Sequence, residues 1–193
     1  LCTILERREA EHFPIHIKLD TGMHRLGFMK HEISELTDFL KTTNRVKVKS
    51  VYSHLAAADD PEQDEFTLAQ IALFQNNADM LTAALGYKPL YHMLNSAGIE
   101  RFPEYQFDMV RLGIGIYGVS AIPGNRLSPV ASFKCKVLQI KTLKPGDGTI
   151  GYGRRGKIAP EGTVIATIPV GYADGVDRHL SCGKGYFKVN GHR

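Results

Sequence analysis

The sequence predicts an α/β region followed by a region made mainly of β-strands. Over roughly residues 1–122, short apolar runs alternate with amphipathic stretches of helical period, which is typical of β-α-β units around a parallel sheet. From about residue 128 the helical period disappears, and turns rich in glycine and proline separate short apolar runs. With 193 residues, 43 % of them hydrophobic, the chain can bury a substantial core.

Four apolar runs in the first region are predicted to be strands: residues 15–19, 46–52, 91–94 and 109–117. In the second run, Val46 and Val48 alternate with lysines as in a half-buried strand, but Val51 falls out of that phase. The fourth run is rich in isoleucine and leucine and contains Gly113 and Gly115.

Two amphipathic helices are predicted in the same region. In residues 31–41, Ile33, Leu36 and Leu40 recur at helical spacing. Residues 65–85 form a longer amphipathic stretch, which Gly86 is expected to end as a C-cap.

The second region is predicted to be a small barrel or sandwich without helices. Its expected strands are residues 130–141, 163–170 and 185–189, with turns at 145–148 and 160–162. Residues 121–128 contain a proline, a glycine and an asparagine in succession and form the expected linker. The predicted domains are therefore residues 1–122 and 128–193.

The first region holds about four strand–helix units, whereas a closed (β/α)8 barrel has eight in about 250 residues. If the region is barrel-like, it is half of a barrel, and an open half exposes two sheet edges. The chain also starts in what reads as the middle of a helix and ends just after a hairpin turn. We therefore expect it to be part of a longer protein.

Composition excludes several classes of protein. The 24 basic and 20 acidic side chains give a formal net charge of +4 and are interspersed, which argues against nucleic-acid binding. Cys2, Cys135 and Cys182 form no paired motif, so a disulfide framework or zinc site is not expected and a reducing compartment is favoured. No apolar run approaches the roughly 20 residues that span a bilayer, and the first residues are mixed and charged. We expect a cytoplasmic protein that binds no membrane.

Polar side chains follow the predicted strands at their carboxyl ends, where α/β barrels carry their functional groups. They are Arg25, His54 and Ser96, and Arg111 lies within the fourth predicted strand, beside a glycine-rich backbone around residue 113. Convergent donors of this kind suit a phosphate and an anionic or planar heteroaromatic ligand.

Five motifs at these positions resemble those of the fold-type III, pyridoxal-phosphate-dependent alanine racemases. They are DTGMHRLG at 20–27, NSA at 95–97, VRLGIGIYG at 110–118, GYG at 151–153 and PVGYADG at 169–175. The family usually has serine where Gly151 stands. The motifs occur in the family's order and cover almost the whole chain. The resemblance implies the C-terminal half of a TIM-type barrel, followed by part of a mainly-β domain.

The resemblance also implies a site for pyridoxal 5'-phosphate. Arg111 would hydrogen-bond the pyridine nitrogen and keep it unprotonated, because a guanidinium does not give up its proton to the ring. His54 would lie beside Arg111, and Ser96 would hold the phosphate with the backbone N–H groups of Gly113 and Ile114.

For the substrate, the resemblance implies that Arg25 faces the alanine carboxylate and that Lys18 occupies a position carbamylated in many members. Tyr152 would be the base for the L-enantiomer and Tyr172 would line the substrate corridor, both acting on the cofactor of a partner subunit. The implied protein is a bacterial homodimer with a shared active site, which supplies D-alanine for peptidoglycan.

Each of these residues also has a purely structural interpretation. Ser96 could cap a helix, Lys18 could be a solvated strand lysine, and Tyr152 could be an ordinary turn residue. An arginine inside an apolar run, as at Arg111, needs a partner if buried, which favours function. The remaining histidines of interest show no metal pattern and are interpreted as structural or solvent-facing: His16, His24, His92 and His192.

No position matches the family's lysine that anchors the cofactor covalently, so we expect the 193-residue chain by itself to be inactive. Three alternatives stay open. A racemase of broader specificity would share the cofactor motifs, and a non-catalytic module of this fold would lack the lysine. A cofactor-homeostasis barrel would lack the β domain, and residues 128–193 argue against it.

Overall fold

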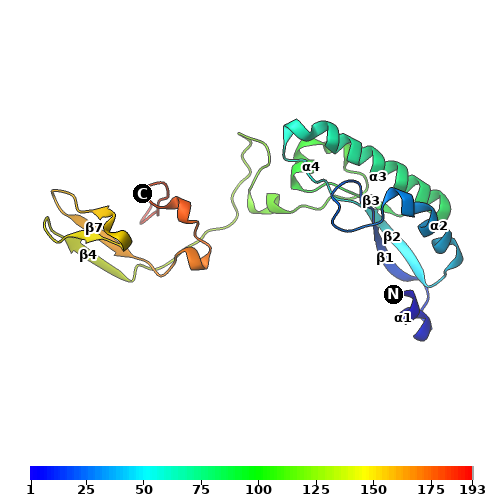
Figure 1. The fold of residues 1–193 in the computed structure, drawn as a ribbon, viewed down its shortest axis with the longest axis horizontal. Coiled ribbons are helices and arrows are strands. Elements are labelled where there is room, and N and C mark those ends of the chain that lie inside the picture. The colour runs from blue at the N-terminus through cyan, green and yellow to red at the C-terminus, as the bar shows by residue number, and fades with distance from the viewer. Residues whose placement is uncertain (193) are drawn as a thin grey trace. The chain divides into compact units, whose positions relative to one another are not determined.

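The structure is a computed structural model that describes residues 1–192. The chain forms two compact units, which divide between Ala131 and Ser132 and are described separately (Figure 1). Within the described residues, no helix combines the length and the apolar character needed to cross a membrane.

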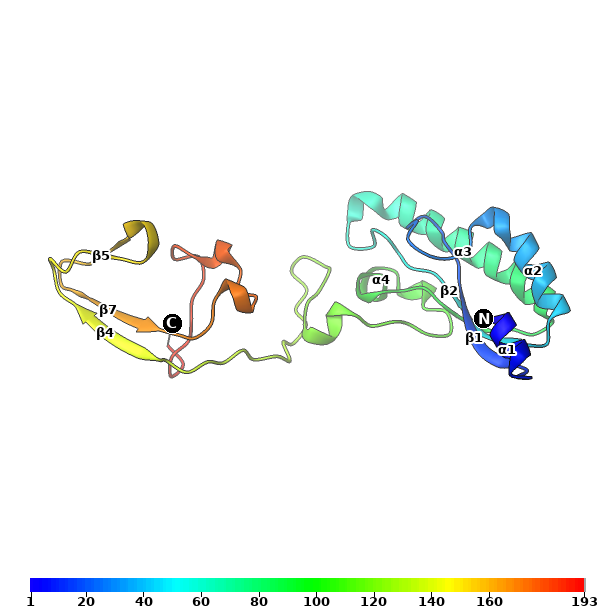
Figure 2. The ribbon, with the colours of Figure 1, turned by 60° about the horizontal axis from the view of Figure 1, so that its bottom comes forward.

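The first unit is built on a three-stranded parallel sheet in the order β1 (Phe13–Lys18), β2 (Val46–Tyr52), β3 (Leu90–His92). Helices α2 (Ile33–Thr42) and α3 (Asp64–Leu85) connect successive strands and cover one face of the sheet (Figure 2). The predicted parallel sheet is thereby confirmed for these strands. Two short helices complete the unit, α1 (Cys2–Arg7) and α4 (Ser96–Arg101).

The core of this unit lies between the sheet and the two long helices. Helix α3 ends at Gly86, which has a left-handed φ of 71°, as the sequence predicts. Phe74 of α3 is fully buried and packs edge-on against the rings of Tyr91 and Phe107. The other fully buried large apolar side chains come from all layers: Leu19, Ile33, Val48, Val51, Leu55, Ile71, Leu81, Met93 and Leu94.

An irregularity in β2 gives the sheet its second, polar face. Ile15 of β1 pairs with Val48, but the next residue, His16, pairs with Ser50, so Lys49 is an extra residue in β2. Because a strand alternates faces, one extra residue reverses the pattern after it. Val51 therefore joins the buried helix-side face, which explains why it falls out of the sequence phase.

The predicted strand at 109–117 is wrong. Met109 makes a single parallel bridge to His92, and Ile114–Tyr117 forms a 3-10 turn. The physical reason lies in the backbone N–H groups of Gly113 and Gly115, which donate to the Ser96 hydroxyl oxygen at 2.9 and 3.0 Å rather than to a neighbouring strand.

The second unit consists of two antiparallel pairs, β4 (Gln139–Leu143) with β7 (Thr163–Thr167) and β5 (Thr149–Ile150) with β6 (Gly156–Lys157). Its strands are shorter than predicted. The first strand is predicted at 130–141, but only residues from Gln139 onward pair with β7. Residues 130–138 lie outside any strand. Residues 185–189 do not form the predicted strand, and Val189 makes only an antiparallel bridge to His192.

Candidate functional site

Three side chains from the carboxyl ends of the parallel strands lie on the polar face of the sheet. Lys18, Tyr52 and His92 are neighbours in register on β1, β2 and β3. The rings of Tyr52 and His92 stack with centroids 5.0 Å apart and an interplanar angle of 6°. Arg111 lies over the Tyr52 ring, with its guanidinium carbon 5.3 Å from the ring centroid. The strands thus bring aromatic and cationic groups to one place.

Arg111 is held by neutral acceptors. One terminal nitrogen, Nη2, donates to the Ser53 carbonyl oxygen at 2.6 Å and lies 3.3 Å from His54 Nδ1. The other, Nη1, lies 2.6 Å from His92 Nδ1. The backbone carbonyls of His92 and Met93 also accept, at 3.2 and 3.3 Å. None of the ion pairs among residues 1–192 involves Arg111, so its charge is positioned without being neutralised.

The ionisable groups around Arg111 feel this uncompensated charge. Burial, and then Arg111, Arg25 and Lys18, lower the pKa of His54, which favours its neutral form. Burial and the charge of Arg25 lower the pKa of Lys18, against the opposing effect of Asp20. A half-buried cluster of positively charged side chains attracts an anionic ligand.

Ser96 organises the turn that follows Arg111. Its hydroxyl oxygen accepts the N–H groups of Gly113 and Gly115, so its own hydroxyl proton remains available to a ligand. A Cβ on Gly115 would lie 3.3 Å from Ser96 Oγ and 3.0 Å from Leu112 Cδ1, which shows how close the backbone approaches. The cap of helix α4 is Asn95, whose Oδ1 accepts from the Gly98 N–H at 3.0 Å. The alternative interpretation of Ser96 as the cap is wrong.

The loop after β1 is folded around Asp20. One carboxylate oxygen accepts the N–H groups of Gly22 and His24, both at 3.0 Å. Burial acts to raise the pKa of Asp20, but these two hydrogen bonds and nearby positive charge lower it below its ordinary value. Lys18 Nζ donates to the Leu26 carbonyl at 2.7 Å and closes the loop from the other side.

Gln70 joins this loop to the segment that carries His54. Its Oε1 accepts the Ala56 N–H at 3.0 Å, and its Nε2 donates to the His54 carbonyl and to Thr21 Oγ1, both at 3.4 Å. Gln70 is 1 % exposed, so helix α3 supplies a buried polar support beneath two loops of the site.

The structure brings most of the predicted residues together. Lys18, Arg25, His54 and Arg111 interact electrostatically, and Ser96 lies against the Gly113 turn, where Ile114 begins the 3-10 segment. Tyr152 and Tyr172 belong to the second unit and are exposed, and the structure does not join them to the first group.

Sequence reasoning missed His92 and Tyr52 as members of the site. The sequence indicates a structural or solvent-facing His92, yet the residue is 5 % exposed and its ring contacts Arg111 directly. His92 ends β3 in the structure, but it is the second residue of the strand predicted at 91–94, so its place at a strand end could not be predicted. Among residues 1–192, no group of three histidine, cysteine, aspartate or glutamate side chains could hold a metal ion.

The donors fit a planar ligand that carries a phosphate. A Cβ at Gly115 would be crowded, and the Ser96 hydroxyl beside this turn can donate to a phosphate oxygen. Arg111 offers a permanent donor without a carboxylate partner, which matches a ring nitrogen that accepts a hydrogen bond. The residues present therefore fit pyridoxal phosphate.

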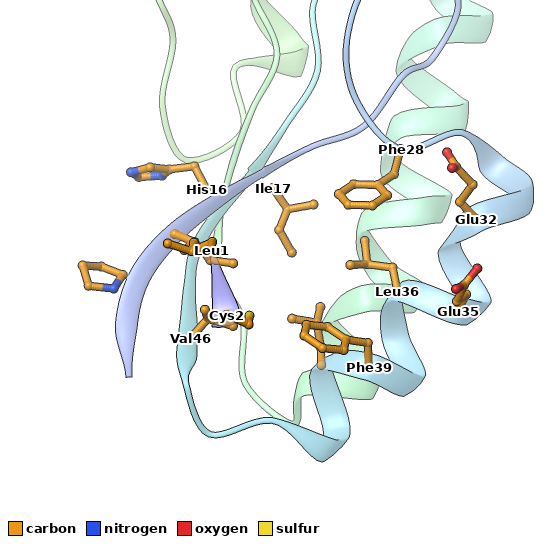
Figure 3. Close-up of a pocket in the computed structure, with 13 residues that line it drawn as sticks. Leu1, Cys2, His16, Ile17, Phe28, Glu32, Glu35, Leu36, Phe39 and Val46 are labelled. Atoms are coloured by element: carbon orange, nitrogen blue, oxygen red, sulfur yellow. The ribbon is translucent and has the colours of Figure 1, made fainter. Parts of the chain in front are cut away.

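A separate apolar cavity also lies in the first unit. It measures about 690 Å³ and is lined by Ile17, Phe28, Leu36 and Phe39 between β1 and α2, with Glu32 and Glu35 at its rim (Figure 3). Neither His54 nor Arg111 lines it, so it is separate from the cationic cluster.

Comparison with known proteins agrees with this geometry. The family model "Alanine racemase, N-terminal domain" matches residues 2–121, and "Alanine racemase, C-terminal domain" matches residues 130–193. "Alanine racemase 2" of Bacillus subtilis (strain 168) is 36 % identical over 98 % of this chain and 50 % of its own length.

Two solved structures extend the comparison. Alanine racemase from Corynebacterium glutamicum has a TM-score of 0.73 at 28 % identity, over 93 % of this chain and 47 % of its own. Alanine racemase from Bartonella henselae with covalently bound pyridoxal phosphate has a TM-score of 0.68 at 30 % identity, over 93 % and 48 %. The chain thus spans about half the length of the relatives that it matches. Two family models in succession and a sequence relative across nearly all of its residues show that this chain belongs to the alanine racemase family.

Proposed function

We propose that the protein containing this chain is a pyridoxal-phosphate-dependent alanine racemase that interconverts L-alanine and D-alanine. The observation that carries the proposal is Arg111, a half-buried guanidinium held by backbone carbonyls and two histidines with no carboxylate partner among residues 1–192. A ring nitrogen that faces arginine instead of a carboxylate stays unprotonated, which favours simple removal and return of a proton.

The first unit would bind the cofactor. Arg111 would donate to the pyridine nitrogen, with neutral His54 beside it. Ser96 and the N–H groups of Gly113 and Ile114 would bind the phosphate, supported by the close approach of Ser96 Oγ to the glycine turn. When bound, pyridoxal phosphate supplies the electron-withdrawing ring that makes the α-proton of alanine acidic.

The substrate residues divide between the two units. Arg25 would bind the alanine carboxylate, and Tyr152 would take the α-proton of L-alanine and return it to the same face of Cα. Tyr172 would line the route to the site. The exposure of both tyrosines fits action in the active site of a second subunit, which makes the enzyme a homodimer.

Lys18 would be carbamylated. Its lowered pKa favours the neutral amine, which adds carbon dioxide with loss of one proton to give a carbamate. The carbamate would place a negative charge beside Arg25 and orient it.

We further propose that residues 1–122 are the C-terminal half of a (β/α)8 barrel and that residues 128–193 begin a mainly-β domain. Three parallel strands in sequence order, with the two long helices α2 and α3 on one face, support the first part. The product would serve peptidoglycan synthesis in a bacterial cytoplasm.

The test uses the complete open reading frame with added pyridoxal phosphate. L-alanine to D-alanine conversion and α-proton exchange from each enantiomer would be measured for the parent, Tyr152→Phe and the control Tyr105→Phe. We expect an active parent and control, with exchange lost mainly from L-alanine in Tyr152→Phe. A parent that binds the cofactor and leaves alanine untouched would overturn the substrate assignment.

A panel of L-amino acids would separate an alanine racemase from one of broader specificity. The 193-residue chain by itself is expected to show no racemisation, since no position matches the lysine that anchors the cofactor. Turnover by that chain with pyridoxal phosphate would contradict this expectation.

A further inference from the structure

A line of hydrogen-bonding groups runs from Arg111 across the polar face of the sheet. Arg111 Nη1 lies 2.6 Å from His92 Nδ1, and His92 Nε2 lies 2.9 Å from Ser50 Oγ. Ser50 Oγ lies 2.7 Å from His16 Nδ1. The line crosses β3, β2 and β1 in turn and uses one side chain from each strand.

The bulge in β2 makes this line possible. Without the extra residue, Ser50 would share the helix-side face with Val48. With it, Ser50 pairs with His16 in register and points to the polar face, where it is 1 % exposed. In Figure 3 the side chains of His16 and Ile17 leave opposite sides of β1, and Ile17 points toward Phe28 and Leu36.

The direction of every hydrogen bond follows from one group. A guanidinium can only donate, so His92 Nδ1 must accept and carry no proton. Neutral His92 then has its proton on Nε2 and donates it to Ser50 Oγ. The Ser50 hydroxyl proton is left to point at His16 Nδ1, which accepts in turn.

The surroundings of His92 support this order. His92 is 5 % exposed and its ring stacks on Tyr52, so the ring has little freedom to turn. Burial, followed by the charges of Arg111 and His16, lowers the pKa of His92 to about 4, so the ring stays neutral at physiological pH.

We propose that Ser50 and His16 are positioning residues for Arg111, because they hold His92 in the tautomer that presents its Nδ1 lone pair to the guanidinium. If Ser50 is removed, the His92 Nε2–H loses its acceptor in a buried site, and the ring can reorient toward another partner. Arg111 then loses its shortest contact with a histidine. The relevance to the cofactor rests on the proposed function, whereas the hydrogen-bond order does not.

The test is nitrogen-15 NMR of histidine side chains in the complete protein without cofactor, at neutral pH. We expect His92 to show a protonated Nε2 and an unprotonated Nδ1. Ser50→Ala should shift the His92 Nε2 and His16 Nδ1 resonances, and Ser50→Thr should restore them. The control is Thr67→Val, since Thr67 is buried and its hydroxyl has no partner within residues 1–192.

A second readout uses the protein loaded with pyridoxal phosphate. Ser50→Ala should shift the absorption band of the cofactor and lower kcat about fivefold to tenfold with little change in KM, while Thr67→Val should change neither. If Ser50→Ala fails to fold, His16→Leu tests the same line from the edge strand, because Ser50 then loses its acceptor.

The proposal is overturned if His92 carries its proton on Nδ1, or if both variants leave its resonances unchanged. A parent without racemase activity would overturn the proposed function. The NMR experiment would still test the hydrogen-bond order, because it is made without cofactor.

Discussion

The backbone carbonyl of Ser53 accepts a hydrogen bond of 2.6 Å from Arg111, a residue 58 positions later in the chain. The contact joins the end of β2 to a segment that the sequence predicts to be a strand and that is irregular. Backbone carbonyls can orient a guanidinium and leave its positive charge in place, whereas a carboxylate would neutralise that charge. The backbone of the protein therefore orients Arg111 toward a ligand and leaves its charge available.

Replacement of Arg111 by lysine should weaken cofactor binding about tenfold or more. An ammonium group keeps the charge but cannot reach the Ser53 carbonyl and His92 at the same time, because it lacks the planar fork. The affinity for pyridoxal phosphate would be measured by fluorescence or absorbance titration of the complete protein.

The control for that substitution is Arg126→Lys, at an exposed position in the connecting segment. It should leave the affinity unchanged. Equal affinities for the parent and Arg111→Lys would show that the guanidinium geometry is unimportant for binding.

A methyl group at Gly115 should weaken phosphate binding about fivefold. The new Cβ would lie 3.0 Å from Leu112 Cδ1 and 3.3 Å from Ser96 Oγ, so the Ser96 hydroxyl has to move. Ser96→Ala should have a similar effect through loss of the hydroxyl itself. Binding of inorganic phosphate and of pyridoxal phosphate by Gly115→Ala would be compared with Gly124→Asn, where the side chain enters open space. Unaltered phosphate affinity in both Gly115→Ala and Ser96→Ala would place the phosphate elsewhere.

The sequence predicts the elements of the first unit that bury apolar side chains on one face. The second strand was predicted with the bounds that the structure has, and the long helix differs by one residue at its start. The bulge was not predictable from hydrophobic periodicity. The periodicity indicates which residues are buried, but it does not indicate on which face of the sheet each of them lies. Val51 out of phase was its only trace, and Ser50 is buried on the other face with Val51 beside it.

The site residues that belong to sequence motifs were predictable, whereas a residue that joins the site only through its packing contacts was not. Arg111, Ser96 and Lys18 stand within or beside recognisable motifs. The structure places Lys18 and Arg111 at the polar face of the sheet and Ser96 against the turn that follows Arg111. His92 stands in no such motif, and only the stacking on Tyr52 and the contact with Arg111 identify it. The strand predicted at 109–117 failed because a serine side chain competes for backbone donors, which apolar periodicity cannot detect.

Removal of the Asp20 carboxylate should cost about 2 kcal/mol of unfolding free energy, because two backbone N–H groups lose a charged acceptor. The pKa of Asp20 is lowered in the folded state, so its stabilisation is present above the ordinary value near 4. It disappears as pH falls below that value toward the lowered one. Urea unfolding of Asp20→Ala and of the exposed control Asp38→Ala checks this. Similar losses in both variants would mean that the loop does not depend on Asp20.

Because of His92, the protein should be less stable in mild acid than at neutral pH. Burial, Arg111 and His16 lower its pKa from about 6.5 to about 4. Between these two pH values His92 is therefore protonated in the unfolded chain and neutral in the folded protein. The unfolding free energy should therefore fall between pH 6.5 and pH 4, by up to about 3 kcal/mol from this residue. The pKa of His54 is also lowered, mainly by burial, and adds to the loss in the same direction.

His92→Gln should flatten the pH dependence, since glutamine does not titrate, even if it lowers stability at pH 7.5. His31→Gln is the matched control, because His31 is exposed and its replacement should leave the slope unchanged. Urea unfolding at pH 7.5, 6.0 and 4.5 would resolve the difference. The stabilisation by Asp20 changes with pH only below this window, so the two effects are separable on one titration. A wild-type slope retained in His92→Gln would mean that His92 binds its proton in the folded protein as readily as in the unfolded chain. The tautomer that faces Arg111 would then have to be reassigned, because a protonated ring cannot accept from a guanidinium.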